Sequence, residues 1–336
     1  MNPPAQSTRA DSPPRVALWA RFASRAGAAL RPFVALIVVA AIFVAIPPHH
    51  AFTLMDLRLV AVHTIIVGTA AIGAALVIAS GGLDLSIGSA IALTSVVAAL
   101  ALHAGWPLPL AGACAILAGV ACGAYNGMLV TALRLPPFIV TLGTLGLYRG
   151  LAKWTAGPSP VSADPGDLAL LVHPIPPSRW MLVAPGVWLM LALGLLMIAL
   201  IRSTVLGRHA IAIGSNETAA RYAGLPVART KILLYAIAGS LVGLAGLLQF
   251  ARITQGDPTI AVGIELDVIA AVVIGGASLS GGRAPVLGAI VGAFMMAYMK
   301  NRCARLEWQT YTQEIIVGHI IIVAVAIDLW RRRRSV

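Results

Sequence analysis

Long apolar runs, separated by short polar or proline-containing stretches, dominate the sequence. A helix needs about 20 apolar residues to cross a bilayer, and fewer when its ends reach the headgroups. By that measure the pattern predicts ten spans, at 30–47, 60–80, 86–103, 108–133, 137–156, 184–201, 231–250, 264–280, 285–300 and 314–330. The fold class that follows is an all-α integral membrane protein of about ten transmembrane helices. Broken or re-entrant segments are expected where glycine and polar residues interrupt the runs, as at 86–103 and 264–280.

The composition excludes two classes of protein. Of the 336 residues, 59% are hydrophobic and 11% are charged. Soluble domains are about 25% charged, so a soluble globular protein is excluded, and so is a disordered chain, which needs low hydrophobicity. The three cysteines exclude a disulfide scaffold and are expected to be small packing residues.

The formal net charge of +12 reflects the membrane topology of the chain rather than binding to nucleic acid. A basic protein binds nucleic acid when its Lys and Arg form one face, but here they flank the predicted spans. Most of them fall on one side when the N-terminus is placed in the cytoplasm. We therefore expect contact with membrane lipid and not with nucleic acid. The predicted parts are a cytoplasmic tail at 1–29, a transmembrane domain at 30–330 and a basic cytoplasmic tail at 331–336. A basic cluster at 300–305 is the exception, because it falls on the outer side.

The loop at about 206–230 is the most informative polar stretch. Ser215 or Asn216 can cap a short helix, Glu217 suits the positive helix N-terminus, and Gly224 is a natural stop. So short a helix is unstable alone and must pack on the membrane domain or in a partner. An ordinary connector and a docking element for a cytoplasmic partner explain the loop equally well. The chain has no phosphate-binding G-x-x-x-x-G-K-[ST] loop, so any ATP-derived energy comes from another chain.

A glycine-rich break at 81–88 places Asp84 and Ser86 at membrane depth. Unwound backbone is tolerated there only inside protein or against a water-filled cavity, and an acid there is a functional candidate. Capping of the helix that starts near Ser86 is the simpler role for Asp84, and the two roles are compatible. The same pattern, G-G-x-x-L-S-x-G, returns at 275–282, which indicates an internal repeat or a chance match.

Further polar residues within the spans are candidates for a translocation pathway. With Asp84 and Ser86, they are Asn126, Thr141, Thr144 and Gln249. Hydrogen bonding between helices is the simpler role for Asn126 and Gln249 taken singly. Arg149 suits lipid headgroups, an acid or polar substrate groups. The histidines show no metal-ligand spacing and no nucleophile lies beside a base, so we expect neither a metal site nor an enzyme.

Four blocks in the same order resemble the permease subunits of bacterial ABC importers for monosaccharides, of the ribose, arabinose and xylose type. They are 81–99 (GGLDLSIGSAIALTSVVAA), 133–152 (LRLPPFIVTLGTLGLYRGLA), the loop 206–230 and 265–283 (ELDVIAAVVIGGASLSGGR). The resemblance covers about residues 60 to 330. It departs at 300–313, which is more charged than usual, and at Ala284, where glycine is common.

The resemblance implies an inner (plasma) membrane permease whose two termini are cytoplasmic. Its implied partners are a second permease copy, identical or closely related, a cytoplasmic ABC ATPase and a periplasmic sugar-binding protein. The chain itself then binds no cofactor, because ATP and Mg are used by the ATPase. In the family, the loop after the sixth span docks into the ATPase. Here that role falls to Gly214, Ser215, Asn216, Glu217, Ala220, Arg221, Gly224 and Pro226.

The function that follows is translocation of a monosaccharide, delivered by the binding protein and driven by the separate ATPase. One alternative is an ABC permease for another small polar solute, such as a nucleoside, a branched-chain amino acid or a signal sugar. Another is an ion-coupled secondary transporter, with Asp84, Asp267 and Glu314 as its ion sites.

Overall fold

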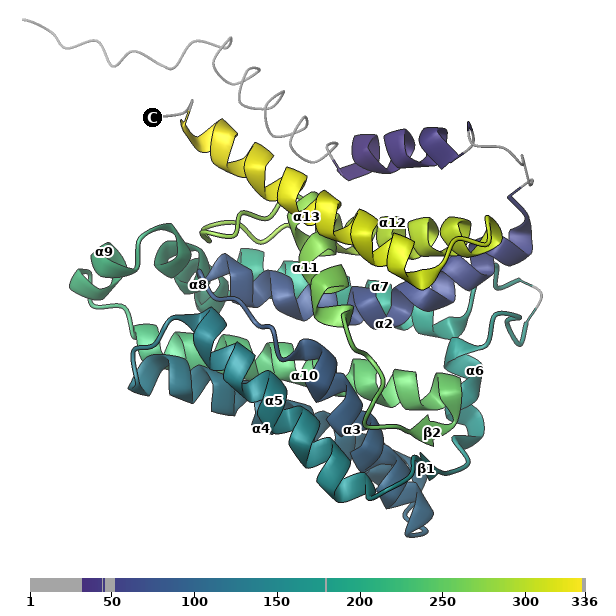
Figure 1. The fold of residues 1–336 in the computed structure, drawn as a ribbon. Coiled ribbons are helices and arrows are strands. Elements are labelled where there is room, and N and C mark those ends of the chain that lie inside the picture. Colours follow the sequence, from purple (N-terminus) through teal and green to yellow (C-terminus); the bar gives the residue numbers. More distant parts are fainter. Residues whose placement is uncertain (1–31, 44, 46–51, 179, 334–336) are drawn as a thin grey trace, which may run out of the picture.

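The computed structural model describes residues 32–43, 45, 52–178 and 180–333, which form a bundle of mostly long helices (Figure 1). An apolar helix Pro32–Phe43 precedes the labelled elements. In order, these are α2 (Leu54–Ala79), α3 (Ile87–His103), α4 (Leu108–Ala132), α5 (Pro137–Ala156), β1 (Val161–Ser162), the 3-10 turn η1 (Gly166–Leu168), α6 (Ala169–Val172), α7 (Pro185–Ser203), α8 (Val205–Ser215), α9 (Glu217–Tyr222), α10 (Val227–Ile253), β2 (Gln255–Gly256), α11 (Ile264–Ile274), α12 (Val286–Arg305) and α13 (Thr310–Arg333).

The prediction of an all-α membrane protein is confirmed. Within the described residues a helix lies in each of the ten predicted ranges, and four of these helices are long and apolar enough to span a membrane: α2, α4, α7 and α10. The tail predicted at 1–29 lies outside the described residues. Of the tail predicted at 331–336, residues 331–333 continue α13 and the rest lie outside the described residues.

Glycines bring α4 and α10 into close backbone contact. Gly119 and Gly123 of α4 face Gly239 and Gly243 of α10, and a Cβ on Gly123 would overlap the carbonyl oxygen of Tyr235. Each pair has small-xxx-small spacing, which lets two helix backbones touch in a membrane. This crossing also fixes the depth of Asn126, one turn beyond Gly123.

Helix α2 forms the centre of the bundle. It contacts α7, α10, α11 and α12, and 89% of its most apolar window is buried inside the protein. Its hydrophobicity therefore faces other helices rather than lipid. Thr53 caps its start, with its side-chain oxygen accepting from the amide of Asp56 at 3.2 Å.

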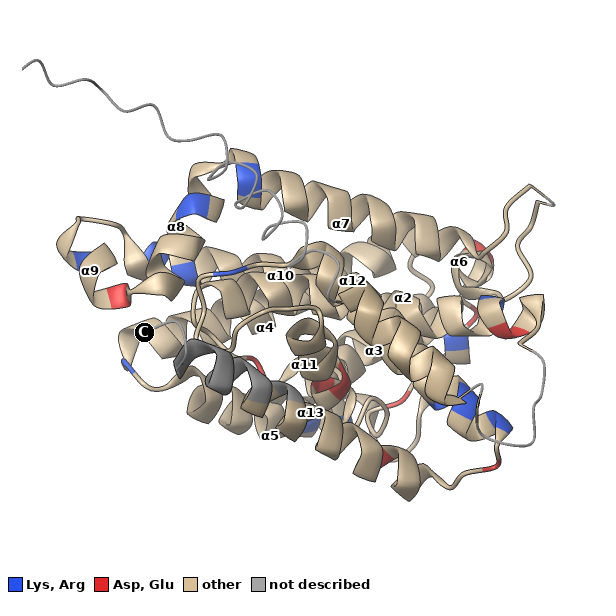
Figure 2. Cartoon of the chain, turned by 90° about the horizontal axis from the view of Figure 1, so that it is seen from above, with Lys and Arg blue, Asp and Glu red and all other residues tan. Residues whose placement is uncertain are grey.

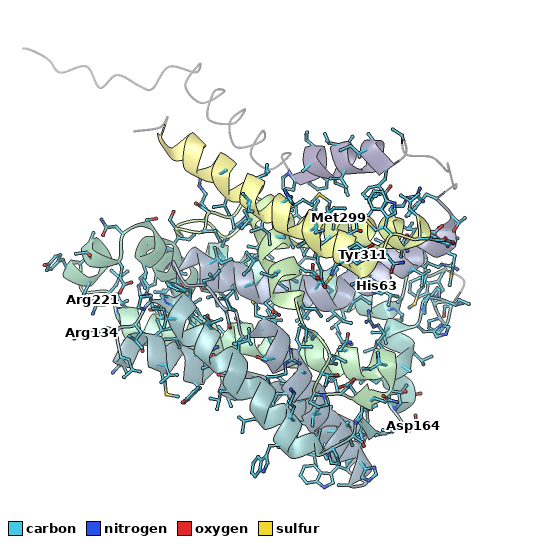
Figure 3. The ribbon with its side chains drawn as sticks, viewed as in Figure 1. His63, Arg134, Asp164, Arg221, Met299 and Tyr311 are labelled. Carbon is cyan, nitrogen blue, oxygen red and sulfur yellow. The ribbon has the colours of Figure 1, made fainter. Side chains whose placement is uncertain are left out.

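The charged residues mark two ends of the bundle (Figure 2). Around α8 and α9 they are mostly Lys and Arg, whereas acids such as Asp56, Asp164 and Asp257 occur in the connections and helix ends of the opposite end, where α6, β1 and β2 lie. Arg134 and Arg221 lie at the first end and Asp164 at the second (Figure 3). The exposed side chains Trp106, Trp154, Trp180 and Trp188 all belong to the second end, as expected for an aromatic belt at a membrane surface.

Ion pairs at this second end explain the basic cluster at 300–305. Arg305 pairs with Asp56 at 2.5 Å, and Lys300 pairs with Asp267. Both acids are nearly buried, with side-chain exposures of 3% for Asp56 and 5% for Asp267. The cluster that stood out among the sequence charges is thus partly neutralised by acids distant in sequence.

Candidate functional site

The break between α2 and α3 forms the candidate site. Helix α2 ends at Ala79, and the chain turns through Gly81, whose φ of 77° is in the left-handed region that favours glycine. The amide of Gly82 donates back to the carbonyl of Val77 at 3.0 Å, which closes the turn. Residues 83–85 are then non-helical until α3 starts, and they carry Asp84 into the interior.

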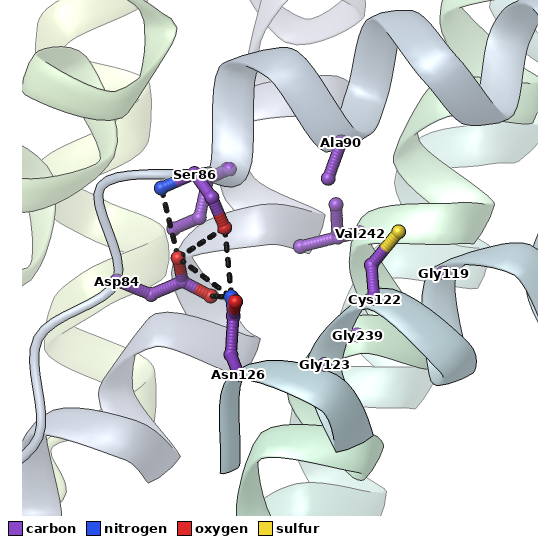
Figure 4. Close-up of a pocket in the computed structure, with 10 residues that line it drawn as sticks. Asp84, Ser86, Ala90, Gly119, Cys122, Gly123, Asn126, Gly239 and Val242 are labelled. Atoms are coloured by element: carbon purple, nitrogen blue, oxygen red, sulfur yellow. Dashed lines mark hydrogen bonds between the residues drawn. The ribbon is translucent and has the colours of Figure 1, made fainter. Parts of the chain in front are cut away.

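Three of the predicted pathway residues meet here through direct hydrogen bonds (Figure 4). Asp84 Oδ1 accepts from the amide of Ser86 at 2.9 Å and from its hydroxyl at 2.6 Å. Asn126 Nδ2 donates to Ser86 Oγ at 2.9 Å and lies 3.5 Å from both carboxylate oxygens of Asp84. Asp84 thus accepts from the amide and hydroxyl of Ser86, as expected from the sequence, but Ser86 is itself the N-cap of α3 and no side chain caps the first turn of that helix. A further contact reaches across to α4. We call Asp84, Ser86, Asn126 and Tyr148 the polar cluster.

Tyr148, which was not among the predicted pathway residues, extends the polar cluster to α5. Its hydroxyl lies 2.9 Å from Asn126 Oδ1 and 2.8 Å from the carbonyl oxygen of Cys122. The single proton of the Tyr148 hydroxyl thus faces two acceptors, and the hydrogen bonds continue from the Asn126 amide to Ser86 and from the Ser86 hydroxyl to Asp84. The spacing 141, 144, 148 places Tyr148 on the same helical face as the two predicted threonines, which is the signal that would have found it.

The backbone beside Asp84 is held from two further helices. The carbonyl oxygen of Leu83 accepts from Thr141 Oγ1 at 3.2 Å and from the Tyr235 hydroxyl at 3.3 Å. Thr144 donates to the carbonyl of Thr141 within α5. Nothing in the sequence around Tyr235 indicates this contact, because it depends on how α10 crosses the break.

Most of the polar cluster is buried. Ser86, Asn126 and Tyr148 are at most 2% exposed, and Thr141 and Thr144 beside them are at most 3% exposed, whereas Asp84 is partly exposed. The cavity beside Asp84, lined also by Gly119, Gly123 and Gly239, has a volume of about 10 Å³. That volume suits a single water molecule and no larger ligand.

Two other predicted polar residues lie outside the polar cluster. Gln249 is buried on α10, seven residues after Val242 of the cavity wall, which is roughly 10 Å along a helix. Arg149 donates to the carbonyls of Pro258 at 2.7 Å and Ile260 at 2.6 Å. Arg149 therefore holds the 257–260 loop against α5, a role that was not among those expected from the sequence.

The polar loop at 206–230 contains two helices rather than one. Thr204 caps α8 by accepting from the amide of Gly207 at 3.2 Å, and Asn216 caps α9 by accepting from the amide of Ala219 at 2.9 Å. Of the two predicted capping residues, Asn216 is the cap, whereas Ser215 is the last residue of α8. Gly224 follows α9 with a φ of 78°, which agrees with its predicted role as the helix stop.

Salt bridges and a small apolar cluster attach α9 to α10. Glu217 bonds to Lys231 at 2.6 Å and to Arg221 at 2.9 Å, and Ala220 is buried against Ile213 and Val227. Burial on its own would raise the pKa of Glu217, but the hydrogen bonds and charges of Lys231 and Arg221 outweigh it and hold that pKa below its usual range. One face of α9 is therefore fixed to the bundle.

The opposite face of α9 is exposed in the part of the chain that the structure describes. Tyr222 is 88% exposed and Thr218, Arg221 and Ala223 are exposed beside it. A bulky aromatic residue presented in this way is typical of an anchor for a partner protein.

Comparison with known proteins assigns the family. The family model described as branched-chain amino acid transport system / permease component matches residues 57–325. The chain belongs to this permease family. The matched range begins in α2 and ends in α13, so it contains the break at Asp84, the polar cluster and the α8–α9 segment.

Curated relatives cover most of the permease. It is 36% identical over 298 residues to the ribose import permease protein RbsC of Escherichia coli K12, covering 89% of this chain and 92% of the relative. It is 33% identical over 300 residues to the autoinducer 2 import system permease protein LsrC of Photorhabdus luminescens, covering 89% of each chain. It is 34% identical over 273 residues to the L-arabinose ABC transporter permease protein AraH of Azospirillum brasilense, covering 80% of this chain and 78% of the relative. No solved structure matches the chain.

Proposed function

We propose that this chain is the membrane permease subunit of an ABC importer and that it carries a monosaccharide. One observation carries this conclusion: relatives named as ribose, L-arabinose and autoinducer 2 import permeases are 33–36% identical over at least 80% of the chain. The chain acts as a passage and makes no covalent change to the sugar. Selection of the sugar falls mainly to a periplasmic binding protein.

ATP hydrolysis belongs to a separate cytoplasmic ATPase, which uses ATP and Mg. The three lysines of the chain are Lys153, Lys231 and Lys300, and none of them ends a glycine-rich phosphate loop. Helix α9 is the element that docks into this ATPase. Its exposed Tyr222 and Arg221 support docking, and the fixed contacts of Ala220 and Glu217 transmit force to α10.

The orientation follows from the same assignment. The end that carries α8 and α9 faces the cytoplasm, and the described Lys and Arg residues there outnumber the acids, in keeping with the positive-inside rule. The end with β1, β2 and the exposed tryptophans faces the periplasm, where the binding protein docks. The N-terminus is on the cytoplasmic side, and so is the C-terminus.

The translocation pathway runs beside the polar cluster, between this chain and a second permease copy. Carboxylate, hydroxyl and amide groups are the partners that sugar hydroxyls need, and Asp84, Ser86, Asn126, Thr141 and Thr144 supply them from the break, α4 and α5. Because the adjoining cavity holds one water at most, sugar passage requires α5 to move away from the break. Gln249 serves a position nearer the periplasm.

Reconstitution tests the proposal. Proteoliposomes containing the chain and its ATPase, supplied with binding protein and labelled ribose, arabinose or autoinducer 2, are expected to take up at least one solute only when ATP is enclosed with the ATPase. Uptake driven by a proton gradient, without the ATPase, would instead establish an ion-coupled transporter. Labelled leucine serves as the control for a branched-chain amino acid permease and is expected to stay outside.

A further inference from the structure

Three glycine-containing segments from distant parts of the sequence meet backbone to backbone where α2 ends (Figure 1). They contribute Gly81 after α2, Gly214 in the last turn of α8, and Gly281 and Gly282 between α11 and α12. The amide of Gly282 donates to the carbonyl of Ala79 at 2.9 Å. We call these four glycines the glycine junction.

A Cβ does not fit at Gly214 or Gly281 of the glycine junction. A Cβ on Gly214 would overlap the carbonyl oxygen of Ala79 and lie 2.5 Å from the nitrogen of Gly282. A Cβ on Gly281 would lie 2.7 Å from the carbonyl oxygen of Gly214 and 2.9 Å from the nitrogen of Gly81. Gly81, Gly281 and Gly282 also have φ values of 77, 90 and 79°, which disfavour any other residue.

The glycine junction forms one short path between α9 and the polar cluster. Gly214 is two residues before Asn216, the cap of α9, and Gly81 is three residues before Asp84. Contacts between backbones contain no rotatable side chain that could absorb a displacement, and packed interiors transmit strain. A movement of α9 relative to α2 must therefore shift the break that carries Asp84 or separate the glycines.

We infer that the glycine junction passes the displacement of α9 to both broken segments, 80–86 and 275–285, in a single step. The inference rests on the proposed function, because it takes α9 as the element that docks into the ATPase. It also gives the repeated pattern G-G-x-x-L-S-x-G a physical role. The copy at 81–88 contributes its first glycine to the contact, and the copy at 275–282 contributes its last.

Gly281→Ala tests the inference by adding one methyl group to the glycine junction at a residue outside the set assigned to ATPase docking. The variant is reconstituted in proteoliposomes with the ATPase that co-purifies with the wild-type chain and with the binding protein. We expect ATPase co-purification and basal ATP hydrolysis to stay within twofold of wild type, while sugar uptake falls at least tenfold. Gly157→Ala is the matched control, because Gly157 also has a positive φ, of 78°, but a Cβ there meets nothing within 4 Å, so its uptake should stay within twofold.

Uptake by Gly281→Ala within twofold of wild type would overturn the inference. Should that variant fail to fold, Gly282→Ala decides the question, because its Cβ would lie 2.8 Å from the Ser215 side chain but no closer than 3.4 Å to a backbone atom. This second variant is expected to retain the ATPase and to lose at least tenfold of uptake, and wild-type uptake would again overturn the inference. A wild-type chain that binds no ATPase would contradict the proposed function itself.

Discussion

Replacing Asn126 by Asp should disrupt the polar cluster through charge rather than through shape. The two side chains have nearly the same volume, so the helix contact between α4 and α10 is preserved. The substitution puts a carboxylate oxygen where Asn126 Nδ2 lies 3.5 Å from both oxygens of Asp84. Two unit charges at that distance repel by about 5 kcal/mol at an effective dielectric constant of about 20. The lost hydrogen bond to Ser86 adds about 1 kcal/mol.

A loss of that size is a large part of the stability of a typical domain, about 5–15 kcal/mol. The assay is equilibrium unfolding of the purified permease in mixed micelles of a mild detergent and SDS, followed by tryptophan fluorescence. Asn126→Ala, which removes the same hydrogen bonds without adding charge, should cost only about 1–2 kcal/mol.

The decisive variant combines Asn126→Asp with Asp84→Asn, which restores a single negative charge to the pair. A double-mutant cycle should then recover most of the repulsion as a coupling energy of about 3–5 kcal/mol. The reasoning is refuted if Asn126→Asp unfolds within about 1 kcal/mol of wild type, or if the double variant is no more stable than Asn126→Asp alone.

Three further substitutions test other contacts. The pKa of Glu217 is below its usual 4.5 in the folded chain, so its ion pairs should stabilise α9 at pH values above about 4.5 and be lost as the pH falls further. The difference in unfolding free energy between wild type and Glu217→Gln should therefore disappear in acid. Lys300→Met leaves the 5% exposed Asp267 without its cation and should lower the unfolding free energy by about 2 kcal/mol, with recovery in Lys300→Met/Asp267→Asn. Gly123→Ala should cost about 1–3 kcal/mol by the same unfolding assay, whereas Gly146→Ala, with nothing within 4 Å of its Cβ, should cost nothing.

The positions of the helices could be predicted from the sequence, because each apolar run predicts a helix independently of the rest of the fold. A run of apolar residues predicts a helix in a membrane whatever its neighbours are, and α3, α4 and α5 begin and end within one residue of the predicted bounds. Helix α8 was missed because it is a polar-loop helix that depends on the Thr204 cap and on packing against α7.

The polar cluster could be predicted only in part. Asp84 and Ser86 are close in sequence, and Asn126, Thr141 and Thr144 stand out as polar residues in apolar spans. The contact of Tyr235 with Leu83 could not be foreseen, because it follows from the glycine crossing of α4 and α10. In the same way, the ion pairs of the basic residues at 300–305 could not be foreseen, because their partners Asp56 and Asp267 are distant in sequence.

The shortness of α11 constrains how this protein enters the membrane. Its 11 residues span about 16 Å, roughly half of the 30 Å hydrocarbon layer, and Gly275 ends it there. Alone, such a segment would leave its last carbonyls unsatisfied in lipid, so it cannot insert as an independent helix. Backbone contacts of Gly275 with Gly288 and of Ala271 with Gly292 join it closely to α12. The insertion machinery must therefore hold α11 until α12 has been synthesised, and the two must partition into the bilayer as one hairpin.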